Sequence, residues 1–595
     1  MPDRTSTFPR TKDTVLSLEV QARMPAGDPE EPVQFKILIR HFLERFFNNE
    51  MASADGEGKA RLIQVACAVG FPGFIMALYL YPTYHPPRGH RPYWAQVSDH
   101  YFYTTYSLVA LGVVTIFEWD FFFPNLLDVF VLSTLPIRNR RLFLARIAAI
   151  SIFVAGFLFD SNFLAPLVLP AATEPPNLLR LLAAHLMAVA LSGLFAAALV
   201  LSLQGFLLGV FGQQFFRRIA LWLQGLSITA LLVLLLLTPA IAAVLRQLIL
   251  STGDAALWFP PFWFLGVYQR ILEGPAALPA FARLAQTGCV ATAFAIALAV
   301  LTYPLAYWRR TRELIEGSTS RDAHSPLAIG INSILSATIL RNPIRSAICR
   351  FISQTLFRVQ RYRIYLVMYG GLGFALITAS AIRLSLAHGA IRFDFSSSGL
   401  RAAVPIVAFW TVAGLRTAFL SPTDQRGGWV FRIIQRRPGP AHLRAAKSFV
   451  LLWALVLCMG IVALTHALGS AGLRDWKVTA VQALVAIALP LLLTDIFFLK
   501  VTTIPFTGAP PRPATHLATV LTIYAGIFPV LIFLTLNVET WLESGVSHIV
   551  FTATLVVAAH LALRAIHRKI VSRYTGQMDL DDDQEEFPQT LGLRY

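Results

Sequence analysis

Ionisable side chains lie within long apolar stretches of this 595-residue chain, or at their ends, where they could bind a proton, an ion or a polar substrate. A charged group in lipid is costly, so such residues are functional candidates by default. They are Asp160, His185, Arg416, His466, Asp495 and His560. Asp495 follows Pro490 by five residues in one apolar stretch, and we predict that it lines a pathway. The sequence shows no sustained series of Asp, Glu and His for a proton relay, which disfavours a proton-coupled carrier.

Glu118 and Asp120 are the one acid pair that would suit a membrane-embedded enzyme acting on lipid or polyprenyl substrates. An interfacial acid pair that balances nearby arginines explains the same residues. The chain has no G-x-x-x-x-G-K-[ST] loop, no HExxH and no kinase signature. The four cysteines have no metal-ligand spacing. We therefore expect no catalytic residue, no metal and no cofactor in this chain.

The composition indicates an integral membrane protein. Hydrophobic residues make up 56% of the chain and charged residues only 14%, against about 25% charged in soluble domains. The net charge of +17 would suggest nucleic acid as the partner of a soluble protein. In a membrane protein it indicates basic cytoplasmic loops that face anionic lipid, so we expect membrane lipid and no nucleic acid as a partner.

Apolar stretches long enough to cross a bilayer recur about twelve times. The predicted fold is therefore all-α, a multi-pass bundle of about twelve helices in two six-span halves. The predicted spans lie near 61–82, 101–118, 142–165, 178–204, 217–245, 288–307, 362–384, 401–420, 447–468, 477–500, 515–537 and 545–566. The basic loops alternate with less charged ones, which predicts that both termini face the cytoplasm.

The predicted division of the chain has five parts. Two amphipathic segments, 35–47 and 331–357, each precede a set of six spans and are predicted to lie in the membrane interface. The parts are a disordered cytoplasmic tail at 1–34, a first membrane half at 35–310, a basic cytoplasmic linker with an amphipathic helix at 311–361, a second membrane half at 362–567 and an acidic cytoplasmic tail at 568–595.

The segment from Glu118 to Arg146 predicts an elbow at the membrane surface. Pro124 and Pro136 break a helix, so a short separate helix is expected between them. Aromatic residues such as Trp119 favour the headgroup zone. Leu126, Leu127, Phe130 and Val131 share one apolar face, which Leu135 continues. An ordinary amphipathic loop anchored at the interface explains the same pattern.

This elbow resembles the first cytoplasmic loop of the type-2 ABC exporter permeases. The residues that carry the resemblance are Trp119, Phe123, Pro124, Asp128, Leu135, Pro136, Arg138, Arg140 and Arg141. The resemblance implies a permease of the prokaryotic inner membrane, with both halves fused in one chain. It also implies that separate ATPase subunits, which carry ATP and Mg²⁺, dock on the elbow and drive outward transport. Glu118, Trp119 and Asp120 then belong to the coupling element together with those residues.

A second segment repeats this plan after the eighth predicted span. Its expected coupling residues are Trp429, Arg432, Arg436 and Arg437. Asp424 is its nearest counterpart of Asp128. The resemblance further implies an outer gate formed by Trp258, Pro260, Pro261 and Trp263, for which an aromatic anchor in the headgroup zone is the alternative. A secondary transporter that needs no ATPase is the alternative function, ahead of the lipid-handling enzyme.

Overall fold

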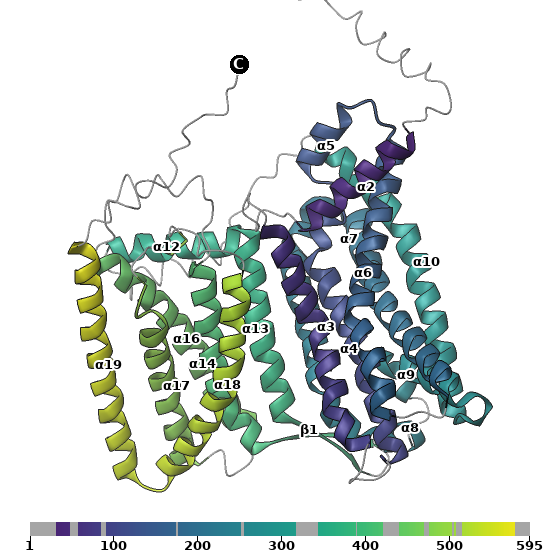
Figure 1. Cartoon of the computed structure of the whole chain (residues 1–595). Helices are drawn as coiled ribbons and strands as arrows, with labels where there is room; N and C mark the ends of the chain where they lie inside the picture. Colours follow the sequence, from purple (N-terminus) through teal and green to yellow (C-terminus); the bar gives the residue numbers. More distant parts are fainter. Residues whose placement is uncertain are drawn as a thin grey trace, which may run out of the picture.

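The structure is a computed structural model in which ten described helices are long and apolar enough to cross a bilayer, so the chain is a multi-pass membrane protein (Figure 1). It describes residues 31–47, 57–84, 91–173, 177–251, 255–316, 343–387, 390–420, 440–468, 475–501, 505–506 and 515–576. Residues 1–30 of the predicted tail, the linker residues 317–342, residues 421–439 of the second elbow and residues 577–595 lie outside these ranges. Residues 31–34, which were predicted to belong to the disordered tail, are helical.

The helices form two bundles that stand side by side in Figure 1. The first contains α2 (Glu31–Phe47), α3 (Glu57–Tyr84), α4 (Tyr93–Phe117), α5 (Leu126–Ser133), α6 (Asn139–Thr173), α7 (Leu178–Leu236), α8 (Thr238–Ser251), α9 (Pro260–Glu273) and α10 (Pro279–Ile315). The second contains α12 (Pro343–Arg358), α13 (Gln360–Ala381), β1 (Ile382–Ala387), β2 (Ala390–Phe395), α14 (Ser397–Leu420), α16 (Pro440–Leu468), α17 (Trp476–Phe497), α18 (Thr515–Glu543) and α19 (Val546–Gly576).

The predicted spans fall on these helices, except that 217–245 continues from α7 into α8 and 362–384 runs from α13 into β1. Two of the helices, α3 and α13, are not among the ten, and the apolar part of α13 is the shorter segment Tyr365–Ala381. The start of α2, α5, α12 and the end of α19 lie on one side of the molecule, which we call the elbow side (Figure 1). The opposite side carries β1 and β2 and is called the hairpin side. Which of the two faces the cytoplasm stays a prediction.

A sharp corner at Gly212 turns α7 back on itself, so that α7 supplies both the fourth and the fifth predicted span. Gly212 has φ 76° and ψ 177°, a conformation open essentially to glycine alone. Arg309 of α10 donates to the carbonyls of Gly209 and Val210 at 2.6 and 3.0 Å. Glu313 accepts from the Gln213 backbone N–H at 3.1 Å. The cation therefore meets a helix C-terminus and the acid a helix N-terminus, as the helix dipoles favour.

The two bundles meet through their first and fifth predicted spans. The second part of α7 packs against α13, and α3 contacts α18. Glycines permit the close approach, since a Cβ at Gly371 would lie 2.8 Å from the Thr229 hydroxyl and one at Gly225 would lie 3.4 Å from Val367. The first predicted span of each bundle thus meets the fifth of the other, as parallel repeats related by an axis along the membrane normal would.

An antiparallel hairpin formed by β1 and β2 joins the bundles on the hairpin side, a feature that the sequence-based prediction missed. The predicted span 362–384 ran into it, whereas α13 ends at Ala381 and Ile382 pairs with Phe395. Strand β1 contacts α8, and Leu384 packs on the apolar cluster between α4, α8 and α9. The second bundle therefore reaches across and contacts the hairpin-side end of the first.

Candidate functional site

The elbow contains the short helix that the two prolines predicted. Helix α5 spans Leu126–Ser133, and the Asn125 side chain caps it by accepting from the Asp128 backbone N–H at 3.0 Å. Its outward face is apolar: the exposed fractions run from 46% to 58% for Leu126, Phe130, Val131 and Leu135. An apolar face of this kind on a fixed helix is suited to packing against something outside the described chain.

The aromatic run before α5 is buried in protein, so its prediction as a headgroup anchor was wrong. Trp119, Phe122 and Phe123 are 2%, 0% and 1% exposed. Trp119 packs on Phe216 of α7, and Phe123 packs on Tyr303 of α10, with ring centroids 5.3 and 5.0 Å apart. The aromatic run of the elbow is therefore inserted into the end of the bundle.

Side chains from α7 and α10 bind three backbone carbonyl groups of this corner. Gln204 Nε2 donates to the Trp119 carbonyl at 2.8 Å, and the Tyr303 hydroxyl donates to that of Phe122 at 2.6 Å. Arg310 Nε donates to the Pro124 carbonyl at 2.8 Å. Buried backbone carbonyls need such partners, and these bonds hold the elbow at a fixed place on the bundle.

A buried ion pair fixes α5 to α6. Arg146 Nη2 lies 2.8 Å from Asp128 Oδ2, and the two side chains are 4% and 7% exposed. The Arg146 guanidinium also lies over the Phe42 ring of α2, at 4.7 Å from its centroid. The sequence assigned Asp128 to the surface that meets a partner, but its carboxylate is turned inward. Its contribution is to orient α5.

Helix α2 packs on α6 with the apolar face that was expected to lie in the membrane interface. Leu38 and Phe42 are 5% and 3% exposed and belong to the same core as Trp119. The salt bridge between Arg40 and Glu44, at 2.7 Å, lies on its outer face. The buried residues of this face are therefore covered by protein, since α2 packs against α6 and α3.

The basic residues after α5 form the rest of the exposed surface. Arg138 and Arg140 are exposed, whereas Arg141 is half-buried and donates to Gln34 Oε1 at 3.2 Å. Pro136 is exposed, and Glu118 and Asp120 are half-buried. We call the exposed surface of the elbow the elbow patch; it consists of Leu126, Phe130, Val131, Leu135, Arg138 and Arg140.

The residues assigned to the second elbow lie outside the described residues. They are Trp429, Arg432, Arg436 and Arg437. Their role as a second coupling element stays a prediction. On the elbow side of the second bundle, α12 packs its apolar residues Ile352 and Leu356 into the core, as α2 does in the first.

The predicted outer-gate residues lie at the start of α9. This helix of 14 residues is only about 21 Å long and cannot cross a bilayer. Pro260 begins it and Pro261 is buried, while Trp258 is 86% exposed. The Trp263 indole donates to the Leu257 carbonyl at 2.7 Å. Helix α9 packs against α4, α7 and α10, so it is part of the bundle core and not a free flap.

A buried polar cluster joins α4, α7 and α9. His185, a candidate from the sequence, lies 3.3 Å from the Tyr268 hydroxyl. His100 stacks on the Tyr268 ring at 4.1 Å and lies 3.0 Å from Gln269 Nε2. The sequence-based search missed His100 and Gln269, because each stands alone in an apolar stretch and only the packing of three helices brings them together.

Asp495 and His560, both candidates from the sequence, come together in the second bundle. The Asp495 carboxylate contacts His560 Nδ1, and Lys447 Nζ lies 3.6 Å from its other oxygen. The cluster is contributed by α16, α17 and α19. His466 lies apart from it and contacts Thr479 at 3.0 Å. The described residues contain no grouping of three His, Cys, Asp or Glu that could hold a metal ion.

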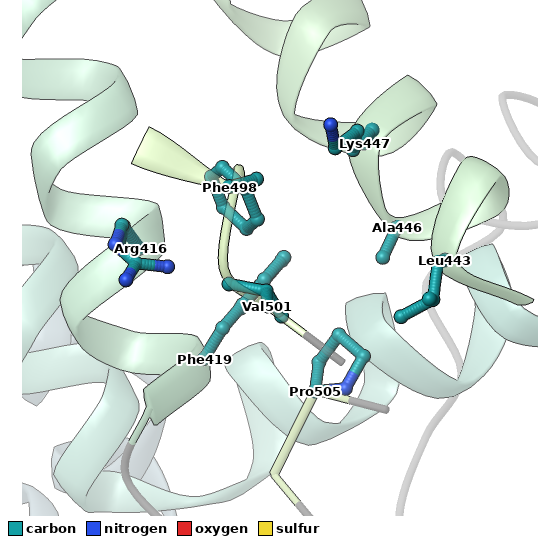
Figure 2. A pocket seen from close by; sticks show the side chains of 8 residues that line it. All are labelled: Arg416, Phe419, Leu443, Ala446, Lys447, Phe498, Val501 and Pro505. Atoms are coloured by element: carbon teal, nitrogen blue, oxygen red, sulfur yellow. The ribbon is translucent and has the colours of Figure 1, made fainter. Parts of the chain in front are cut away.

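A small cavity lies beside this cluster (Figure 2). Its volume of about 20 Å³ has room for a single water molecule. Its lining consists of Arg416, Phe419, Leu443, Ala446, Lys447, Phe498, Val501 and Pro505. Figure 2 shows Phe498 and Val501 between the two basic side chains. The cavity is therefore not an open route for a substrate in this conformation.

Comparison of the chain with protein-family models, with curated proteins and with solved structures found no match. The described residues themselves show a helical membrane protein with ten candidate spans, a fixed elbow with an exposed apolar and basic surface, and buried charged clusters in both bundles.

Proposed function

We propose that the protein is the membrane-spanning permease of an ATP-driven exporter, and that a separate ATPase subunit docks on the elbow patch. The observation that carries the proposal is the combination of exposure and rigidity at α5. Leu126, Phe130, Val131 and Leu135 are exposed, while the segment behind them is held by an ion pair and by hydrogen bonds to three carbonyls.

Rigidity matters because a coupling element must transmit force. An anchored helix pushed by a partner moves the helices that hold it, whereas a loop resting on lipid would yield. Gln204 links the elbow to α7, and Tyr303 and Arg310 link it to α10. In the proposed mechanism, ATP binding brings the partner subunits together, the elbows follow, and the two bundles rock against each other along α7 and α13. ATP hydrolysis is assigned to the partner and not to this chain.

The patch has the composition of a docking surface. Interface energy concentrates in a few residues, often aromatic residues or arginines, set in an apolar surround. Phe130 supplies an exposed ring, and Arg138 and Arg140 supply charges beside it. Asp128 is too buried to contact a partner and acts by fixing the orientation of α5.

The test is co-purification of the ATPase with elbow variants. Replacing Arg138 and Arg140 together by Ala should weaken association by about 1–3 kcal/mol. Leu135→Asp should weaken it further, because it places a charge on an apolar contact face. Arg141 is left unchanged, since its contact with Gln34 would confound the result.

The matched control replaces Arg568 and Lys569 by Ala. Both are exposed near the end of α19, on the elbow side but at the opposite edge of the molecule (Figure 1). The control removes the same number of positive charges and should leave association unchanged. Undiminished recovery of the ATPase with the folded Arg138/Arg140 and Leu135 variants would reject the docking proposal. Equal losses in the control would indicate a general effect of charge.

The Asp495 cluster favours a second candidate function, a secondary transporter. An acid, a histidine and a lysine that meet among membrane-spanning helices are typical of ion-coupled transport. Transport by the purified chain in vesicles, driven by an ion gradient without ATP, would support this function over the first. Transport that requires an added ATPase and ATP would support the exporter.

A further inference from the structure

One carboxylate near the hairpin side of α18 is buried. Glu539 is 1% exposed, and neither of its carboxylate oxygens has a hydrogen-bond partner among the described residues. An ionised carboxylate without water or a donor carries a desolvation cost of several kcal/mol. The neutral, protonated acid is therefore the form compatible with this environment.

Arg401 is the cation that acts on both acids, Glu539 and Glu543. Arg401, near the start of α14, pairs with Glu543 at 2.9 Å, and both side chains are 23% exposed. Glu543 and Glu539 are one turn apart on α18, so they share a face of the helix. Arg401 and Glu543 are the charged groups that act on Glu539. Of the titratable groups at the ends of the neighbouring helices α17 and α19, Asp475 accepts from the Lys477 backbone N–H, and His548 stacks on Trp541.

We propose that Glu539 is a proton-binding site. Its carboxyl group binds either a proton or the Arg401 guanidinium, and the two replace each other. In the described state Glu539 holds the proton and Arg401 pairs with Glu543. When Glu539 loses the proton to water on the hairpin side, Arg401 turns to the new carboxylate. Glu543 remains ionised and becomes solvated. One proton leaves and one ion pair replaces another, so the charge balances.

The exchange couples a proton to the packing of α14 against α18. Arg401 belongs to α14, whereas both acids belong to α18, and one turn of helix separates the acids by about 6 Å. Moving the arginine from Glu543 to Glu539 therefore moves the ionic contact between α14 and α18 by one turn along α18. This inference does not depend on the proposed function, because it concerns the end of the molecule opposite the elbow.

Infrared spectroscopy of the purified protein tests the proposal directly. A protonated carboxylic acid has a carbonyl stretch distinct from those of a carboxylate and an amide, and deuteration shifts it. The wild-type spectrum should contain this band, and Glu539→Gln should remove it. Glu543→Gln should lower this band, because Arg401 then bonds to Glu539 and a charged hydrogen bond shifts the protonation equilibrium constant of Glu539 toward the ionised form by about tenfold or more.

The matched control is Glu313→Gln, which removes an acid that pairs with Arg309 at 3.2 Å and should leave the band unchanged. A Glu539→Gln spectrum identical to that of the wild type would show that Glu539 is ionised and overturn the proposal. A full band in Glu543→Gln would overturn the exchange with Arg401. The Glu543 variant alters a partly exposed side chain, so it decides the question even if Glu539→Gln does not fold.

Discussion

Removing the acid of the buried elbow ion pair should destabilise the protein strongly. In Asp128→Asn, the Arg146 guanidinium stays 4% exposed and loses its charged partner. Breaking a buried pair in this way costs about 3–5 kcal/mol, since the remaining charge is not compensated. The backbone N–H of residue 128 still donates to Asn125, so the cap of α5 is retained and the loss reports on the ion pair.

A double variant separates the pair from its surroundings. Asp128→Leu together with Arg146→Met replaces both charges by apolar side chains, and such replacements are often neutral or stabilising. We expect the double variant to recover most of the free energy of unfolding that Asp128→Asn loses. A double variant as unstable as the single one would indicate that the cost comes from packing and not from the unpaired charge.

The assay is denaturant-induced unfolding of the purified protein in mixed micelles, with Glu44→Gln as the control. Glu44 pairs with Arg40 at 2.7 Å, but the side chains are 53% and 79% exposed. Its loss should cost less than about 1 kcal/mol. The reasoning is refuted if Asp128→Asn lowers the free energy of unfolding no more than Glu44→Gln does, because burial would then have no effect on the value of the pair.

Three further predictions concern topology, energy coupling and the α7 corner. Cysteine labels at Ala323 and within 580–590 should be protected from outside and one near Ala276 accessible; accessible labels at both of the first two positions would contradict the six-plus-six topology. The purified chain should hydrolyse no ATP, and robust hydrolysis by a contaminant-free preparation would argue against the proposed exporter. Gly212→Ala should cost roughly 1–3 kcal/mol, because alanine is strained at φ 76° and ψ 177°. Gly156→Ala, with nothing within 4 Å of its Cβ, should cost far less. Equal thermal stability of the two variants would refute the strain.

The sequence predicted what depends on local chemistry. Apolar length predicted the positions of the helices, and Pro124 and Pro136 predicted a separate α5. The positions of the aromatic side chains depend on tertiary packing, which the local pattern does not contain. Trp119 has the same preference for an interface whether lipid or Phe216 covers it. Only the packing of α7 and α10 over the corner decides between the two.

The sequence does contain a pattern typical of the hairpin, but the longer apolar stretch before it concealed this pattern. Leu384 and Leu386 alternate with Arg383 and Ser385, which is the period of a strand. The apolar stretch before them is long enough for a span, and the predicted span was extended into the alternation. A turn-forming glycine at position 389, midway between the two alternating runs, was the further indication.

Glu539 illustrates the limit of reading ionisable residues from a sequence. It lies four residues before the end of α18, where an acid ordinarily reaches water, and the sequence ranks it no higher than Glu543. The structure separates them, because Glu543 pairs with Arg401, whereas Glu539 has no hydrogen-bond partner in the part of the chain that the structure describes. Asp128 shows the same limit. The sequence places its side chain on the surface, whereas the structure buries it against Arg146. In both cases the function of an acid follows from which cation reaches it, and that is a property of helix packing.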